Sequence, residues 1–332
     1  MNKELLSIIK RITRNLSKNM MLYTLATIIL GITVGYLYNP TFLAKFIPVI
    51  VFFMIYPMMV NVSFESLRNV RKYKKVILLA LLYNFVLAPI IYYFLCSLFK
   101  VTYDIQIALL LLAIAPASSM GIGYVGLAEG NVALASVIVA SAFLIFIIVA
   151  PLVIHFIVSS NYIVLPLEKI IKNLLLVLVL PLLLGVITRE LIIERRNIKF
   201  NEVKPLFSFI TLVFLYILIF SIFALKGRAI LENPTKIAII VPLASLFYII
   251  MLAIEYIVNK YIAKMKYEEF QAVVFTTVSK NVALTMALLA FLFGKHGYIM
   301  AIYPAIISLI QLVFLITYLH FSLQKRHAAA GI

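Results

Sequence analysis

The sequence predicts an all-α polytopic membrane protein of about ten transmembrane helices, and its composition and its apolar runs support that fold class. Hydrophobic residues make up 65% of the 332 residues, charged residues make up 12%, and the mean hydropathy is +1.13. So little polar surface cannot coat a soluble globule. A helix needs about 20 mostly apolar residues to cross the hydrocarbon core of a bilayer. Polar breaks in the chain separate about ten runs of that length.

The predicted spans follow one another with short connections. They are residues 20–38, 42–61, 76–99, 104–128, 132–158, 166–188, 205–225, 236–259, 270–293 and 298–321. Residues 1–19, before the first span, form a basic amphipathic segment, because apolar residues recur at helical spacing between Leu5 and Leu16 and the lysines and arginines fall elsewhere. That pattern is typical of a helix lying in the membrane surface.

The net charge of +17 is distributed as in a membrane protein rather than a nucleic-acid-binding protein. Five basic residues precede the first span, five lie between the second and third spans, and five lie between the sixth and seventh. With ten spans, all of these connections lie on one side. The positive-inside rule then predicts a multi-pass protein of the cell membrane with both termini in the cytoplasm.

Ten spans divide into two sets of five, residues 20–160 and 161–322, followed by a cytoplasmic tail, 323–332. A repeat with an odd number of spans inserts its second copy inverted, which is an architecture of secondary transporters. The fourth and ninth spans support this division, because each contains a polar break about ten residues from its start, at 115–121 and 278–281. The two broken helices are predicted to cross at the bilayer midplane, where protein or a water-filled cavity must receive their free amides and carbonyls.

Lys280 lies in the second break, inside the apolar run 270–293. A charge at that depth is expensive and usually functional. Free amides at helix ends favour anions, and Lys280 adds a full positive charge. The crossing is therefore predicted to bind a small anionic substrate; the alternative is a structural brace in which the ammonium holds carbonyls together. The residues predicted to form the site with Lys280 are Asn84, Pro116, Ser118, Ser119, Gly121, Thr276, Thr277, Ser279 and Asn281, and Gly121 and Gly123 are predicted to allow the close approach.

The chain resembles the bile acid:sodium symporter superfamily, which includes the ten-helix arsenite permeases, over nearly its whole length. Residues 116–122 (P-A-S-S-M-G-I) and 126–134 (G-L-A-E-G-N-V-A-L) are similar to the symporters' P-G-G-A-P-S-N and Y-L-A-R-G-D-V-A-L. Residues 54–57 (M-I-Y-P) and 82–85 (L-Y-N-F) look more like the arsenite permeases. The resemblance implies a panel domain, a core domain in which the broken helices cross, and transport by alternating access.

The departures from the family pattern predict the coupling. Symporters carry E-x-G-x-Q-N in the ninth span, where the glutamate and glutamine ligate sodium, and here Thr276 replaces the glutamate and Lys280 the glutamine. A serine and a threonine ligand of the fifth span align with Ala135 and Val139. Sodium needs several oxygen ligands, and a nearby ammonium would repel it. The chain is thus predicted to be a sodium-independent carrier of a small organic anion, with no metal or cofactor site.

Two alternatives stay open: an arsenite or metalloid permease, and a sodium-coupled bile-acid-type symporter. Arsenite permeases depend on a cysteine in the fourth span and a glutamate in the ninth, which align with Ala117 and Ala283, and Cys96, the single cysteine, lies elsewhere. A channel is a third, weaker alternative, because a charged pore residue would look similar.

Protons are the predicted coupling ion if the carrier is coupled at all. Lys280 could take up a proton with substrate and lose it after release. Glu255, in the eighth span, is the other candidate. The competing interpretation of Glu255 is an interfacial glutamate paired with Lys260 or a neighbour.

Enzymes and ATP-driven pumps are excluded by missing motifs. The chain has one aspartate and no H-E-x-x-H pair, so neither an intramembrane metalloprotease nor an aspartate-rich prenyltransferase site is present in the sequence. No G-x-x-x-x-G-K-[ST] loop is present either. The protein is therefore predicted not to be an enzyme.

Overall fold

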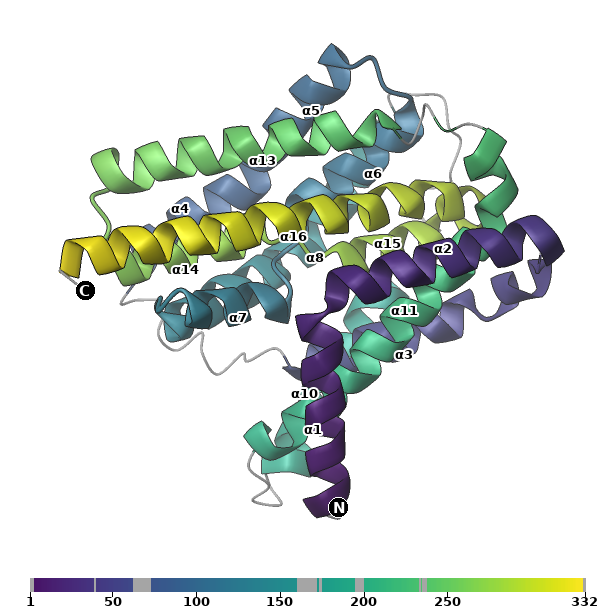
Figure 1. Cartoon of the computed structure of the whole chain (residues 1–332), viewed down its shortest axis with the longest axis horizontal. Helices are drawn as coiled ribbons and strands as arrows, with labels where there is room; N and C mark the ends of the chain where they lie inside the picture. The colour runs from purple at the N-terminus through teal and green to yellow at the C-terminus, as the bar shows by residue number, and fades with distance from the viewer. Residues whose placement is uncertain are drawn as a thin grey trace. The chain divides into compact units, whose positions relative to one another are not determined.

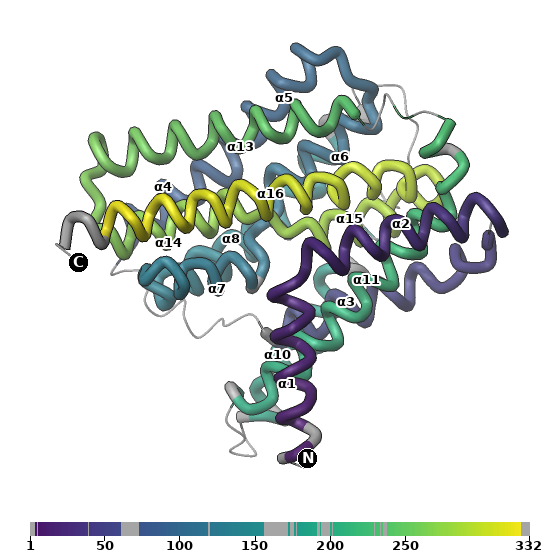
Figure 2. Tube along the Cα trace, viewed as in Figure 1, coloured from purple at the N-terminus to yellow at the C-terminus, as the bar shows by residue number. Residues whose placement is uncertain are grey.

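The computed structural model, shown in Figures 1 and 2, describes residues 3–38, 40–61, 73–159, 172, 175–194, 200–232, 234 and 238–330. Within those ranges the regular structure is helical, apart from a β-bridge between Ala117 and Lys280. The predicted all-α class is thereby confirmed. Parts of the predicted basic connections, 62–72 and 195–199, and the predicted repeat boundary at 160–161 lie outside the described residues.

Helix length and composition confirm a polytopic membrane protein. Six helical stretches in the described ranges are long and apolar enough to cross a membrane: Met20–Tyr38, Lys74–Leu98, Val132–His155, Glu202–Arg228, Ile240–Ile262 and Gly294–Arg326. Shorter apolar helices cover Ile47–Val60, Tyr103–Ile114 and Val282–Leu292. The predicted sixth span lies partly outside the described residues, so the count of ten and the inverted order of the repeats stay predictions.

The chain divides into two compact units, each drawn from both halves of the sequence. Unit 1 contains Met1–Val62, Tyr162–Thr235 and Met286–Ala305, and unit 2 contains Ser63–Asn161, Lys236–Thr285 and Ile306–Ile332. This division agrees with the two-domain fold that the family resemblance implies. Both helix breaks lie in unit 2.

Unit 1 is built around the long helix α11 (Phe200–Glu232). The helices α1 (Lys3–Lys18), α2 (Met20–Tyr38) and α3 (Ile47–Asn61) pack against α11, and α10 (Leu180–Ile187) packs against α3. The second predicted span begins late, because residues Thr41–Lys45 form a 3-10 turn, η1, before α3. Two π-helical turns, η4 (Leu175–Val179) and η5 (Thr188–Glu194), flank α10.

A seam of small residues joins α2 to α11. A Cβ added at Gly35 would lie 2.2 Å from the Ala224 carbonyl oxygen, and one added at Gly31 would lie 2.9 Å from the Phe220 carbonyl oxygen. Gly227, on α11, meets the backbone of Ile32 in the same way. Small residues four positions apart let two helix backbones touch, which is a common basis of helix packing in membranes.

Replacing Gly35 by alanine is expected to lower the melting temperature of the purified protein, because α2 must move away from α11 to accommodate the methyl group. Overpacking of this kind typically costs about 1–3 kcal/mol. Gly123→Ala is the matched control, since a Cβ there would meet nothing within 4 Å. Equal melting temperatures for the two variants would contradict the seam.

Unit 2 gathers the helices that surround the two breaks (Figure 1). They are α4 (Lys74–Leu82), α5 (Ala88–Leu98), α6 (Tyr103–Ile114), α7 (Ser119–Leu127), α8 (Val132–Ser159), α13 (Ile240–Ile257), α14 (Tyr267–Val278), the start of α15 (Val282–Leu292) and the end of α16 (Gly294–Ala330). Helix α14 packs against α4, α7, α8 and α13, while α5 packs against α6 and α13. Helix α16 continues through the predicted tail to Ala330.

The two breaks occur where the sequence predicts them. Helix α6 ends at Ile114, and Ala115 is extended (φ −61°, ψ 134°). Pro116 explains this end, because proline disfavours a helical conformation in the preceding residue and has no N–H for the helix. Helix α14 ends at Val278, Ser279 leaves the helical region (φ −79°, ψ 79°), and α15 starts at Val282.

A third irregularity positions Asn84. The π-helical turn η3 (Tyr83–Leu87) separates α4 from α5, and Asn84 is buried within it. Pro89 follows and has no N–H to donate, so the regular hydrogen-bond spacing cannot continue through this stretch. Such π-turns inside α-helices occur frequently at functional sites.

Candidate functional site

The two breaks meet directly in unit 2. Ala117 and Lys280 form the antiparallel bridge, and the Asn281 amide donates a hydrogen bond to the Pro116 carbonyl at 3.1 Å. Gly121 permits this approach, because a Cβ there would lie 2.9 Å from the Phe275 carbonyl oxygen. The prediction for Gly121 is therefore confirmed. The same prediction for Gly123 is wrong, since that glycine faces open space one helical step away.

Gln311, on α16, holds the backbone of Lys280 in place. The Lys280 amide donates to Gln311 Oε1 at 2.9 Å, and Gln311 Nε2 donates to the Lys280 carbonyl at 3.2 Å. Tyr248, on α13, donates its hydroxyl to the same Oε1 at 2.9 Å. A side-chain amide thus supplies the partners that a continuous helix would otherwise provide, which a buried break requires.

The side chain of Lys280 reaches the first break through Asn84. Lys280 Nζ donates to Asn84 Oδ1 at 2.5 Å, and Asn84 Nδ2 donates to the carbonyl of Ile114, the last residue of α6, at 2.9 Å. Lys280 is 1% exposed and Asn84 is 2% exposed. Because an ammonium has three hydrogens, this neutral amide leaves part of its donor capacity unused within the described residues.

The two threonines of the ninth span differ in their contacts. Thr276 donates its hydroxyl to the Ala272 carbonyl of its own helix at 2.6 Å. The hydroxyl of Thr277 lies 2.8 Å from the Val273 carbonyl and also 2.7 Å from Glu255 Oε1. Thr277 therefore connects α14 to a carboxyl group on α13, whereas Thr276 is used within its helix.

The interpretation of Glu255 as an interfacial glutamate paired with Lys260 is wrong. Glu255 is 0% exposed, and Lys260 Nζ donates instead to the Tyr256 hydroxyl at 3.0 Å. Helix α13 continues as a π-turn, η6 (Val258–Ile262), in which Lys260 is exposed. The two side chains lie on different faces, so Glu255 belongs to the interior of unit 2.

The other predicted residues lie at or next to the breaks. Asn281 is 2% exposed and accepts a hydrogen bond from the Leu284 amide at 3.1 Å, so it caps α15. Ser279 is 0% exposed, and its hydroxyl has no hydrogen-bond partner in the described part of the chain. Ser118 is half-buried at the start of α7 and makes no side-chain cap. Ser119 begins α7, and its side chain lies outside the described atoms.

Sequence reasoning missed four buried polar residues of this region: Tyr83, Tyr248, Asn259 and Gln311. Tyr83 donates its hydroxyl to Asn259 Oδ1 at 2.9 Å. The signal for Gln311 and Asn259 was present, because a lone amide in an apolar span needs a partner inside the protein.

The donor set at the breaks suits an anion better than a metal ion. Among the described residues no three His, Cys, Asp or Glu side chains come together as metal ligands. Glu255 and Lys280 interact electrostatically, but in that part of the chain they form no ion pair within 4.0 Å. The amine of Lys280 therefore has a neutral partner.

These observations define a polytopic membrane protein with two helix breaks joined inside one unit, as in membrane carriers. The model of the Sodium Bile acid symporter family matches residues 48–233, more than half of the chain, and the protein belongs to that family.

Two curated relatives place the chain among transport proteins. The arsenical-resistance protein Acr3 of Alkaliphilus metalliredigens (strain QYMF) is 26% identical over 253 residues, which are 69% of this chain and 71% of the relative. A protein named as an uncharacterized transporter of Synechocystis sp. is 29% identical over 276 residues, which are 76% of this chain and 71% of the relative.

Proposed function

We propose that this protein is a sodium-independent secondary transporter that moves a small organic anion by alternating access, with Lys280 in place of the family's sodium site. The observation that carries the proposal is the buried amine of Lys280 at the junction of the two breaks, hydrogen-bonded to the neutral amide of Asn84. A carboxylate that replaced Asn84 as the partner would make a charge-assisted hydrogen bond, roughly twice as strong as a neutral one.

The contacts around Lys280 support sodium independence. Thr276, at the position of the family's glutamate ligand, gives its hydroxyl to its own helix. Ala135 and Val139, at two further ligand positions, are buried apolar residues. A sodium ion would have few oxygens to bind here and would be repelled by the ammonium.

Glu255 is the proposed proton-binding group if transport is coupled to protons. The Thr277 hydroxyl has one hydrogen but two acceptors within reach, Glu255 and the Val273 carbonyl. A protonated Glu255 satisfies both contacts, because the carboxyl donates to Thr277 and Thr277 donates to Val273. Lys280, Tyr83 and Tyr318 are the titratable groups that interact with Glu255 from the surrounding elements.

The transporter is proposed to sit in the cell membrane as ten spans in two inverted repeats of five, with both termini in the cytoplasm. The two broken helices and the distribution of basic residues support this arrangement. Cysteine accessibility at engineered sites in the connections would test the orientation of each span.

A metalloid permease is the second candidate, because an arsenical-resistance protein is among the relatives. The single cysteine does not support it, since Cys96 is 3% exposed on α5 and lies away from both breaks in the chain. Arsenite is therefore one of the substrates in the test.

The test is uptake by purified protein in proteoliposomes, with labelled short carboxylates, bile acids and arsenite supplied with and without sodium. We expect uptake and saturable counterflow of a carboxylate in sodium-free buffer, and no change in its initial rate when sodium is added. Uptake that requires sodium, or uptake of arsenite alone, would overturn the proposal. Counterflow also separates a carrier from a channel.

A further inference from the structure

Two lysines converge on one tyrosine hydroxyl at the ends of α13 and α16. Lys260 Nζ and Lys325 Nζ each donate to the Tyr256 hydroxyl at 3.0 Å. Two ammonium groups at that distance from one oxygen are separated by no more than twice 3.0 Å. Like charges held so close repel one another, so this arrangement favours the binding of an anion between them.

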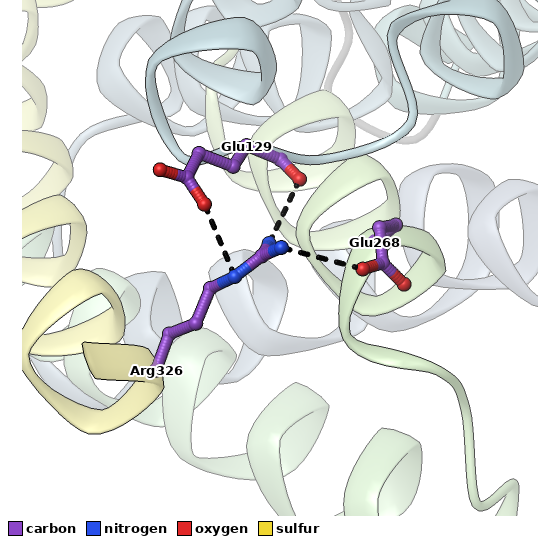
Figure 3. A network of polar contacts seen from close by, with 3 residues as sticks. All are labelled: Glu129, Glu268 and Arg326. Carbon is purple, nitrogen blue, oxygen red and sulfur yellow. Dashed lines mark hydrogen bonds and ion pairs between the residues drawn. The ribbon is translucent and has the colours of Figure 1, made fainter. Parts of the chain in front are cut away.

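The neighbouring carboxylates do not neutralise this pair of lysines. Arg326, the next residue along α16, lies between Glu129 and Glu268, as Figure 3 shows. Arg326 Nε is 3.0 Å from Glu129 Oε2, and Arg326 Nη2 is 3.6 Å from Glu268 Oε1. In the described part of the chain neither Lys260 nor Lys325 has a carboxylate within 4.0 Å. The two lysines therefore keep their full charge available for a ligand.

The surroundings of the lysines point to a lipid. Exposed apolar and aromatic side chains lie beside them on the same two helices: Ile257 is 54% exposed, Tyr261 60%, Ile262 72% and Phe321 44%. Lys325 Nζ lies 4.3 Å from the centre of the Phe321 ring. Lysines and tyrosines at the ends of spans are typical of the membrane interface, where lipid headgroups lie.

We propose that Lys260, Lys325 and Tyr256 bind the phosphate of an anionic phospholipid headgroup at the membrane interface. A phosphate oxygen would lie between the two ammonium groups, and the Tyr256 hydroxyl would donate to it instead of accepting from both lysines. The exposed side chains of Ile257 and Ile262 would contact the acyl chains. This site is independent of the proposed transport function.

The experiment measures binding of phosphatidylglycerol and phosphatidylcholine to the detergent-purified full chain by native mass spectrometry and by melting temperature. Lys260→Gln/Lys325→Gln is compared with Lys74→Gln/Lys75→Gln, because the control pair also consists of exposed lysines at the end of a span. We expect the first variant to lose at least about 10-fold in affinity for phosphatidylglycerol, since two charge-assisted hydrogen bonds are removed. Tyr256→Phe should lose less.

The remaining outcomes are equally definite. Equal losses in the two double variants would overturn the proposal, because they would indicate general attraction of basic residues to anionic lipid. Protection of the wild type by inorganic phosphate alone, as large as that by phosphatidylglycerol, would identify a free-phosphate site and overturn the lipid assignment. Retained affinity for phosphatidylcholine in every variant would show that the proteins are folded and support the site.

Discussion

Replacing Lys280 by methionine is expected to abolish organic-anion transport while leaving the protein folded. Methionine keeps an unbranched apolar stem in the buried position but removes the ammonium. A hydrogen bond to a charged group contributes about 1.5–3 kcal/mol, which corresponds to roughly 10-fold to 100-fold in affinity. Sodium-free counterflow should therefore fall at least about 10-fold. Lys75→Met, at an exposed lysine of the same unit, should transport like the wild type.

The same variant decides between the substrate role and the structural brace. Removing the ammonium leaves Asn84 Oδ1 without its partner, which costs about 1–3 kcal/mol. It also removes the larger penalty of keeping a charge buried. A carrier role therefore predicts a melting temperature close to that of the wild type together with lost transport. A sharply lower melting temperature, with normal transport by the protein that remains folded, would establish the brace instead.

Replacing Glu255 by glutamine is expected to separate exchange from uphill transport. Glutamine imitates the neutral carboxyl but cannot bind or release a proton. Counterflow of substrate should persist, whereas accumulation driven by an inward proton gradient should disappear and the pH dependence of uptake should flatten. The measurement is substrate uptake in proteoliposomes at several internal and external pH values.

Glu202→Gln is the matched control, because Glu202 is an exposed glutamate on α11. This variant should keep the proton-driven accumulation of the wild type. Unchanged accumulation in Glu255→Gln would remove Glu255 from the coupling mechanism while leaving the anion carrier intact. Loss of both exchange and accumulation would show that Glu255 is needed for the structure of the site rather than for coupling.

The amino-acid sequence by itself determined the membrane class and the positions of the helix breaks. Apolar composition and run length are properties of the chain before it folds, and they fix the solvent that the helices need. Pro116 ends α6 through the geometry of its own ring, and the polar residues 276–281 interrupt an otherwise apolar run. Lys280 could be identified as a candidate for the same reason, because a charge in such a run is conspicuous.

Only the tertiary structure decided which groups surround Lys280. Asn84 is 196 positions away along the chain and Gln311 is 31 positions away, yet both bond to Lys280. Glu255 was misplaced because sequence position alone does not show which face of a helix is buried near its end. Hydrogen-bond partners depend on how the helices pack, and packing joins distant residues whose types carry no record of one another. For this reason the sequence indicated where the site lies, and the structure determined its contacts.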